Sequence, residues 1–323
     1  MTSFRGVLLA GFLPLLLAAA PVAQPAPPVA PVAPKAPATK PVVDYTNYKE
    51  RWFSAPKVEN ALLKHSAYHS ALMDTEVGFN IYLPPGYEEA ANAEKRYPVI
   101  YWLHGLNQSE NTNQFPPKII DQAMRAKDVP PMIVVFVSGG SRSFYADSPD
   151  GKLLAESTLI KELIPHIEKT YRVINKRSGR AIQGMSMGGW GAMRMAMTYP
   201  EMFSSVVSFA PSLRTPENLA ETYPDVLNRM FGGDAKRFWN IHPLKLAAER
   251  ADKFKGLSIA FYCGTKDHLL PGSQALHALL TKEGIEHTYD EVESAVHNLD
   301  QLIKKTGIRT LLFAAKGFEV EGK

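Results

Sequence analysis

The 323-residue chain contains one cysteine, Cys263, so an intramolecular disulfide is excluded. It also lacks any dense run of one charge. Its 36 basic and 32 acidic residues give a formal net charge of +4, which does not indicate a nucleic-acid partner. Long apolar runs are scarce too, and we expect no membrane-spanning segment beyond the N-terminal region. Cys263 lies in an apolar stretch, which favours a packed thiol over a reactive one.

The N-terminal region has the composition of an export signal. Arg5 precedes an apolar run over residues 6–20, and small residues follow it. We expect residues 1–23 to be a signal peptide and the protein to be exported, either to a periplasm or outside the cell. An uncleaved membrane anchor is the alternative, although the run of about 15 residues is short for a full span. Once the signal peptide is cleaved, no stable membrane insertion is expected.

Residues 24–44 alternate proline, alanine and valine, a composition typical of an extended linker without a core. The folded domain is therefore predicted at 45–323. Strands are expected at 66–72, 76–83, 97–103, 132–137, 180–185, 204–209, 257–263 and 287–292. Helices are expected at 153–171, 187–198, 273–283 and 298–318, and residues 211–246 are expected to be irregular.

The alternation of strands and helices predicts an α/β fold, with a mostly parallel central sheet of about eight strands and helices on both faces. The first two strands can form an antiparallel edge hairpin. Ligands of such sheets bind beyond the carboxyl ends of the strands. The loops after those ends should therefore converge on one site, with residues 211–246 as its partial cover.

The sequence GMSMGG at residues 184–189 stands between a predicted strand and a predicted helix. That is the setting of a nucleophile elbow, in which Ser186 occupies a very sharp turn. Gly184 and Gly188 lack the Cβ atoms that would clash in such a turn. The pattern predicts a nucleophilic serine, whereas the structural alternative is a glycine-rich turn with an inert hydroxyl.

A serine hydroxyl needs an adjacent base, and the base needs a residue that orients it. Asp267 follows the strand expected at 257–263, and His297 follows the last strand, which gives the chain order serine, acid, histidine. We predict Asp267 as the acid and His297 as the base. The other candidate acids near the last strand are Asp290, Glu291 and Glu293. The other histidines are His65, His69, His104, His166, His242, His268, His277 and His287.

An oxyanion formed at Ser186 needs two donors. The backbone N–H of Met187 is one candidate, because it directly follows the serine. The N–H of Leu106 is the other, because it lies in the loop after the strand at 97–103. His104, in the same loop, is expected to brace the turn. No metal or organic cofactor is predicted, and the i,i+4 pair His65 and His69 has no acidic or cysteine ligand beside it.

Five further segments carry a family resemblance: IYLPPGY at 81–87, YPVIYWLHG at 97–105, YADSPD at 145–150, ELIPHIE at 162–168 and RAIQGMSMGG at 180–189. In order and spacing the chain resembles the putative-esterase family of α/β hydrolases, which includes esterase D-like, feruloyl esterase-like and mycolyltransferase-like members. The resemblance implies the α/β-hydrolase fold, Ser186 as nucleophile, Asp267 as acid and His297 as base. The sequence departs from the family pattern around the histidine. Many members have a glycine before the histidine and an acidic residue and an aromatic after it, whereas this chain reads AVHNL at 295–299.

The resemblance implies a serine esterase that acts through an acyl-enzyme on an acyl or hydroxycinnamoyl (feruloyl-like) ester. Its partner is then a small-molecule or polysaccharide-linked ester substrate. An acyltransferase that moves the acyl group to a sugar hydroxyl is an alternative within enzymes. A non-catalytic binding protein is the alternative of another class. Asp147 and Ser148 are expected to brace their loop rather than bind substrate.

Overall fold

The computed structural model describes residues 52–54, 61–112 and 117–318, which belong to one compact unit within Asp44–Lys323. The expected signal peptide and linker lie outside the described residues. None of the helices in the described part of the chain combines the length and apolar character needed to cross a bilayer.

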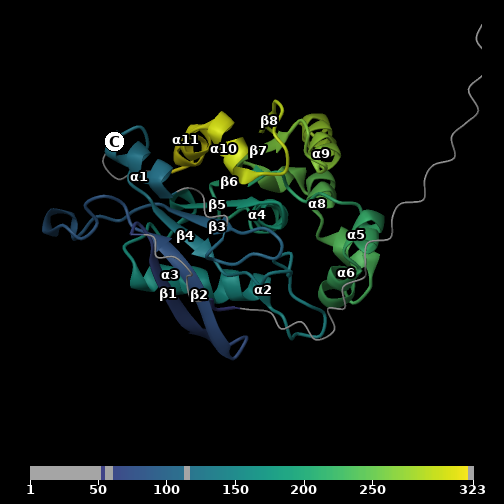
Figure 1. The fold of residues 1–323 in the computed structure, drawn as a ribbon, viewed down its shortest axis with the longest axis horizontal. Helices are drawn as coiled ribbons and strands as arrows, with labels where there is room; N and C mark the ends of the chain where they lie inside the picture. Colours follow the sequence, from purple (N-terminus) through teal and green to yellow (C-terminus); the bar gives the residue numbers. More distant parts are fainter. Residues whose placement is uncertain (1–51, 55–60, 113–116, 319–323) are drawn as a thin grey trace, which may run out of the picture. The chain divides into compact units, whose positions relative to one another are not determined.

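Eight strands of the described residues form one sheet in the order β1-β2-β4-β3-β5-β6-β7-β8. Only β2 runs against its neighbours, since it pairs antiparallel with both β1 and β4 while the other pairs are parallel. The predicted edge hairpin and the mostly parallel sheet are therefore confirmed (Figure 1). The strands are β1 Lys64–Ser70, β2 Thr75–Tyr82, β3 Val99–Leu103, β4 Ile133–Val137, β5 Arg180–Met185, β6 Ser205–Phe209, β7 Ser258–Gly264 and β8 Thr288–Val292.

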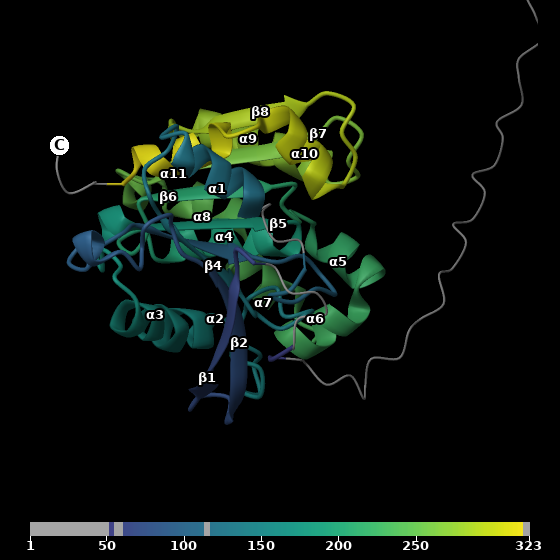
Figure 2. The ribbon, with the colours of Figure 1, turned by 60° about the vertical axis from the view of Figure 1, so that its left-hand side comes forward.

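Helices cover both faces of the sheet, as predicted. The central strands are buried on both sides, and alternate residues of β3 enter two separate cores: Tyr101 one, Trp102 the other. Helices α1 Pro117–Arg125, α10 Leu299–Thr306 and α11 Arg309–Lys316 lie over one face, and α3 Ile164–Thr170 lies over the other (Figure 2). That second face also carries α4 Met187–Thr198, α8 Pro243–Glu249 and α9 Leu270–Lys282.

The expectation of an irregular segment at 211–246 is wrong. It contains α5 Pro216–Thr222, α6 Pro224–Phe231, α7 Ala235–Asn240 and α8. Each is short and three of them begin with proline at the first turn, so their apolar spacing extends over too few residues to give a clear helical period. Helices α5, α6 and α7 pack on one another as one group, which we call the cap (Figure 2).

Other boundaries differ less. Helix α1 was not predicted, and the helix expected at 153–171 consists of α2 Ala155–Ser157, a π-helical segment Thr158–Leu163 and α3. The helix expected at 298–318 is divided into α10 and α11, because Gly307 between them adopts a φ of 58°. Short 3₁₀ turns occur at Ala90–Asn92, Arg177–Gly179 and Ala251–Phe254.

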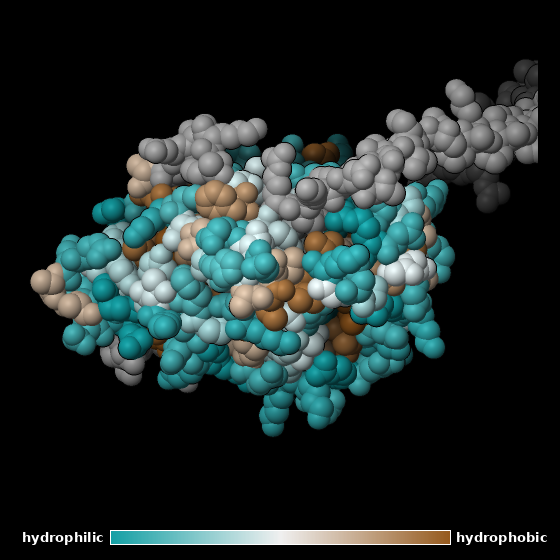
Figure 3. All heavy atoms as spheres, turned by 90° about the horizontal axis from the view of Figure 1, so that it is seen from below, coloured by the Kyte–Doolittle hydropathy of each residue, from teal (hydrophilic) through white to brown (hydrophobic). Residues whose placement is uncertain are grey.

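The cysteine is buried, and within the described ranges the large exposed apolar side chains are few and scattered. Cys263 is buried in β7, as predicted, and burial raises the pKa of its thiol to about 12. The large exposed apolar side chains of the described residues are Phe53, Leu72, Val296 and Leu312, which come from separate parts of the chain. On the face in Figure 3, apolar side chains occur in small groups among hydrophilic ones, as on most protein surfaces.

His242, just before α8, makes the stability of the fold depend on pH. Its imidazole is fully buried, it packs on Trp190 and Phe238, and its Nδ1 accepts a hydrogen bond from the Leu244 N–H at 3.2 Å. Burial lowers its pKa from 6.5 to about 3. Between pH 6.5 and about 3, His242 therefore binds a proton in the unfolded chain but not in the folded chain.

We predict that the free energy of unfolding decreases as the pH is lowered from 7 to 4, with a contribution from His242 on the order of 3 kcal/mol. Urea unfolding of the wild type and of His242→Gln at several pH values measures this contribution. The variant should show a shallower pH dependence. Equal slopes for the two proteins would contradict the assignment.

Candidate active site

Ser186 lies at the turn between β5 and α4, where the chain reverses direction within one residue. Its φ of 59° and ψ of −114° are strained for a residue with a side chain, at a cost of about 1–3 kcal/mol. Its N–H donates to the Phe209 carbonyl at the end of β6, and its carbonyl accepts from Trp190 and Ser212. These bonds hold the strained turn in place and leave the hydroxyl free to face outward.

Glycine is required at two positions of this turn by close backbone contact. A Cβ atom on Gly188 would lie 2.1 Å from the Leu103 carbonyl oxygen, and one on Gly184 would lie 2.4 Å from the Gly188 oxygen. Both contacts are with backbone, which cannot move aside at low cost. The expectation that these glycines permit the sharp turn is therefore confirmed.

The structure brings Ser186, Asp267 and His297 together from three distant segments. His297 Nε2 lies 3.0 Å from Ser186 Oγ, and His297 Nδ1 lies 2.8 Å from Asp267 Oδ2. The Asp267 side chain is fully buried, and its other oxygen accepts the Leu269 N–H at 2.9 Å. Asp267 is thus held rigidly at the end of β7, where it faces the imidazole.

These contacts determine how a neutral His297 carries its proton. A carboxylate only accepts hydrogen bonds, so the proton lies on Nδ1, and the lone pair of Nε2 then faces the Ser186 hydroxyl. The His297 side chain is 28% exposed, which leaves the reacting edge accessible to a ligand. This arrangement can remove a proton from the serine.

Most of the other candidate acids and histidines lie elsewhere; an exception is His268, whose ring lies 4.9 Å from the His297 ring. Asp290 pairs with Arg309, and Glu291 accepts from Tyr289 and Gln274. His166 stacks on Tyr68, and His277 contacts His287. His65 and His69 both lie in β1, where a separation of four residues corresponds to about 13 Å along a strand, too far for one metal ion.

Leu106 and Met187, the two expected oxyanion donors, both line the hollow around Ser186. Neither amide donates a hydrogen bond to another of the described residues. Met187 is the first residue of α4, so its N–H has no partner within the helix and lies at the positive end of the helix dipole. Both amides are therefore available to a ligand.

His104 braces the Leu106 loop, as expected. Its Nδ1 donates to the Gly105 carbonyl at 2.8 Å, and its Nε2 accepts the Gly139 N–H at 3.4 Å. Burial lowers its pKa to about 4, so the ring is neutral at neutral pH. Asp147 has the same kind of role, since both its oxygens accept from Ser157, and Ser148 donates to Asp150.

The hollow around Ser186 has a volume of about 280 Å³ and is formed by the loops that the sequence analysis expected to converge. Phe144 and Leu106 give it an apolar side. The lining residues that were not predicted include Arg214 and Tyr223 from the segment 211–246, and His268 beside Asp267. Their positions after strands β6 and β7 were the available signal, but the direction of each side chain required coordinates.

The altered sequence around the histidine forms part of this wall. Asn298 accepts the Gln301 N–H at 2.9 Å and so caps α10, and Asn298 and Leu299 both line the hollow. The Ala295 carbonyl accepts from Lys266 and approaches Gly264, which ties the His297 loop to the Asp267 turn. The departure from the family pattern therefore leaves the contact of His297 with Asp267 intact.

Asp267, His268 and His297 are also close enough together to be considered as metal ligands, with ligand atoms within 4.8 Å of one another. The arrangement is a poor fit for a cation. Asp267 Oδ2 and His297 Nδ1 are already bonded to each other, and the Arg214 guanidinium lies 3.1 Å from His268 Nε2. A positive charge at that distance opposes a metal ion.

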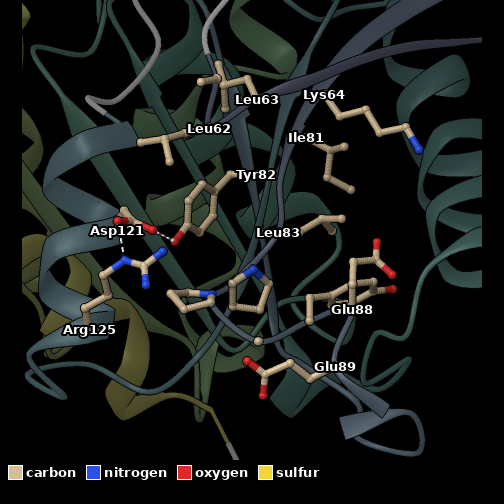
Figure 4. A pocket seen from close by; sticks show the side chains of 15 residues that line it. Leu62, Leu63, Lys64, Ile81, Tyr82, Leu83, Glu88, Glu89, Asp121 and Arg125 are labelled. Carbon is tan, nitrogen blue, oxygen red and sulfur yellow. Dashed lines mark hydrogen bonds and ion pairs between the residues drawn. The ribbon is translucent and has the colours of Figure 1, made fainter.

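Larger hollows lie away from Ser186. One of about 560 Å³ is at the opposite edge of the sheet, where Tyr82 pairs with Val134 near the start of β4. Figure 4 shows the Tyr82 hydroxyl and Arg125 both directed at Asp121, at 3.1 and 2.7 Å. The carboxylate is thus satisfied internally, and the hollow brings together no nucleophile and base. Size therefore does not identify the active site here; chemistry does.

Comparisons with known proteins identify the fold and the family. Among solved structures, a ferulic acid esterase superposes with a TM-score of 0.69 at 23% identity, over 79% of this chain and 98% of that one. An S-formylglutathione hydrolase from Agrobacterium tumefaciens gives a TM-score of 0.68 at 20% identity, over 81% and 98%. The chain therefore has the α/β-hydrolase fold, as predicted.

The profile of the family described as "Putative esterase" matches residues 70–305, and the chain belongs to this family. A curated relative named endo-1,4-beta-xylanase/feruloyl esterase, from Xylanibacter ruminicola, is 32% identical over 161 residues, 48% of this chain and 22% of the relative. An esterase of Mycobacterium tuberculosis is 27% identical over 243 residues, 67% of this chain and 51% of the relative. The chain thus spans about a fifth of the length of the first relative and about half the length of the second.

A buried ion pair joins the cap to the loops beneath it. Arg142, in the loop after β4, donates to both oxygens of Asp225 on α6 at 2.8 and 2.7 Å, and to Asn107 Oδ1 at 2.8 Å. The two charged side chains are 2% and 13% exposed. Asn107 directly follows Leu106, so this pair connects the cap to the loop that carries a candidate oxyanion donor.

We predict that Asp225→Asn lowers the free energy of unfolding by about 2–4 kcal/mol, because it leaves the Arg142 charge buried without its partner. The matched control is Glu249→Gln, which removes a half-exposed ion pair with Lys245 and should cost less than about 0.5 kcal/mol. Urea unfolding measures both. Similar small losses for the two variants would show that the Arg142 pair does not hold the cap.

Proposed function

We propose that the chain is a serine carboxylic ester hydrolase that acts through an acyl-enzyme. The observation that carries this proposal is the chain of contacts from Asp267 through His297 to Ser186, at 2.8 and 3.0 Å. Membership of the esterase family supports the same reaction type. No metal or organic cofactor takes part in the proposed chemistry.

In the first step, Ser186 Oγ attacks the ester carbonyl and His297 Nε2 takes the hydroxyl proton. Asp267 stabilises the imidazolium that forms and holds the ring in place. The carbonyl oxygen becomes an oxyanion, for which the N–H groups of Leu106 and Met187 are the proposed donors. Each such donor is worth about 3–4 kcal/mol of transition-state stabilisation.

In the following steps, the imidazolium protonates the departing alcohol oxygen, and the acyl group remains on Ser186. His297 then takes a proton from water as the water oxygen attacks the acyl-enzyme. The bond between the acyl carbon and Ser186 Oγ breaks, the imidazolium returns its proton to Oγ, and the carboxylic acid is released. The strained conformation of Ser186 supports this cycle, because the hydroxyl is already aimed at the base before substrate binds.

The proposed substrate is an acyl or hydroxycinnamoyl ester, either a small molecule or one linked to a polysaccharide. The names of a relative and a structural neighbour, feruloyl esterase and ferulic acid esterase, motivate the acyl part. Phe144 and Leu106 supply an apolar wall on which such an acyl group can pack. We further propose that residues 45–323 form the catalytic domain of an exported protein, on the composition of residues 1–44.

We predict that Ser186→Ala lowers kcat for a p-nitrophenyl ester by about 10⁴-fold or more, because the nucleophile is removed. The same variant should lose labelling by a fluorophosphonate probe. Ser178→Ala, at the opposite end of β5, is the matched control and should retain both properties. Retention of more than a few per cent of the rate by a folded Ser186→Ala protein would remove Ser186 from this role.

Water is proposed as the acceptor of the acyl group. We predict that added alcohols and sugars at millimolar concentration divert only a minor share of the acyl-enzyme, because water is in large molar excess over them. Product analysis with increasing alcohol concentration measures this partition. Transfer as the main outcome at millimolar sugar would instead support an acyltransferase.

A further inference from the structure

Arg214 brings a positive charge to the wall of the hollow around Ser186. It is half-buried, in the loop between β6 and α5, and its guanidinium makes two polar contacts. One nitrogen donates to Asn218 Oδ1 at 2.6 Å, and another lies 3.1 Å from His268 Nε2. Its buried Nε has no hydrogen-bond partner among the described residues.

No carboxylate among the described residues neutralises this charge, whereas the fully buried arginines have ion pairs. Arg142 pairs with Asp225, and Arg194 pairs with Glu156 at 2.9 Å. The acid beside His268, Asp267, is engaged by His297 and by the Leu269 N–H. Arg214 is therefore a cation held at the reaction site without a counter-ion.

The His268 contact does not remove the charge. An arginine side chain only donates hydrogen bonds, so His268 Nε2 accepts, and the His268 ring in this contact is neutral with its proton on Nδ1. That nitrogen lies 3.4 Å from Asp267 Oδ1. The guanidinium also lies 5.2 Å from the centre of the Tyr223 ring, which holds it in one orientation without neutralising it.

The position of Arg214 relative to His297 indicates which part of a substrate it faces. The His268 ring lies 4.9 Å from the His297 ring, and the Arg214 guanidinium contacts Nε2 of His268. In ester hydrolysis the base gives its proton to the departing alcohol oxygen, so the alcohol portion lies on the side of the imidazole. Arg214 is therefore on the alcohol side of the scissile bond.

We propose that Arg214 is a specificity-determining residue that binds a carboxylate on the alcohol portion of the substrate. The preferred substrate is then an acylated hydroxy acid, either free or as a sugar acid. The inference rests on the proposed esterase function and adds the chemistry of the leaving group to it. A guanidinium offers paired donors that match the two oxygens of a carboxylate, and its rigid placement limits the ordering needed on binding.

The test compares two isosteric esters, 2-acetoxypropanoate and 2-acetoxypropanamide, by acetate release with the full chain. A charge-assisted contact in a half-buried site corresponds to a preference of about 10- to 100-fold in kcat/KM for the carboxylate. In Arg214→Gln the ratio should fall to near one, and in Arg214→Lys it should be intermediate. Arg237→Gln, an exposed arginine on α7 of the cap, is the matched control and should keep the wild-type ratio.

The ratio separates failure of this inference from failure of the proposed function. If the wild type hydrolyses both esters at equal kcat/KM, the carboxylate site is disproved and the esterase function stands. If it hydrolyses no ester at all, the proposed function fails, and a second measurement still tests the site. That measurement is the binding of 2-hydroxypropanoate and its amide by Ser186→Ala. Tighter binding of the carboxylate, lost in Ser186→Ala/Arg214→Gln, supports it; equal binding disproves it.

Discussion

The close packing of the β5–α4 turn against the end of β3 is the constraint on which the site depends. Gly188 of α4 lies so near the Leu103 carbonyl that a side chain at this position would push α4 away from the end of β3. At this turn Ser186 adopts its strained conformation, and the first residue of α4 lines the same hollow as Leu106. The packing of the surrounding sheet must offset the free-energy cost of this strained turn.

Around that turn, the parallel sheet places polar groups where their chemistry can combine. Strands β3, β5, β6, β7 and β8 all end at the same edge, so loops distant in sequence meet there. The cap then closes one side, held by the Arg142–Asp225 pair. The loop that leads into the cap contributes Arg214, and the link between α5 and α6 contributes Tyr223, so the segment after β6 carries the proposed selectivity.

Much of this could be predicted from sequence, for physical reasons. Buried parallel strands give continuous apolar runs, and the turn at Ser186 tolerates only glycine beside it, so both leave a local signal. The chain order of Ser186, Asp267 and His297 placed each at the end of a strand. The helices of 211–246 and α1 are so short that their apolar residues do not repeat often enough to show a helical period. The orientation of Arg214 and His268 depends on tertiary contacts, which no local pattern encodes.

In the proposed function, His297 makes Ser186 nucleophilic, and Ser186 carries the acyl group during turnover. Acid quenching of the reaction with p-nitrophenyl acetate, followed by peptide mass spectrometry, tests it directly. If Ser186 is the nucleophile, the peptide that contains it gains the mass of one acetyl group, and this gain is absent after His297→Gln. Acetylation at another residue, or no acyl-enzyme during rapid turnover, would contradict it.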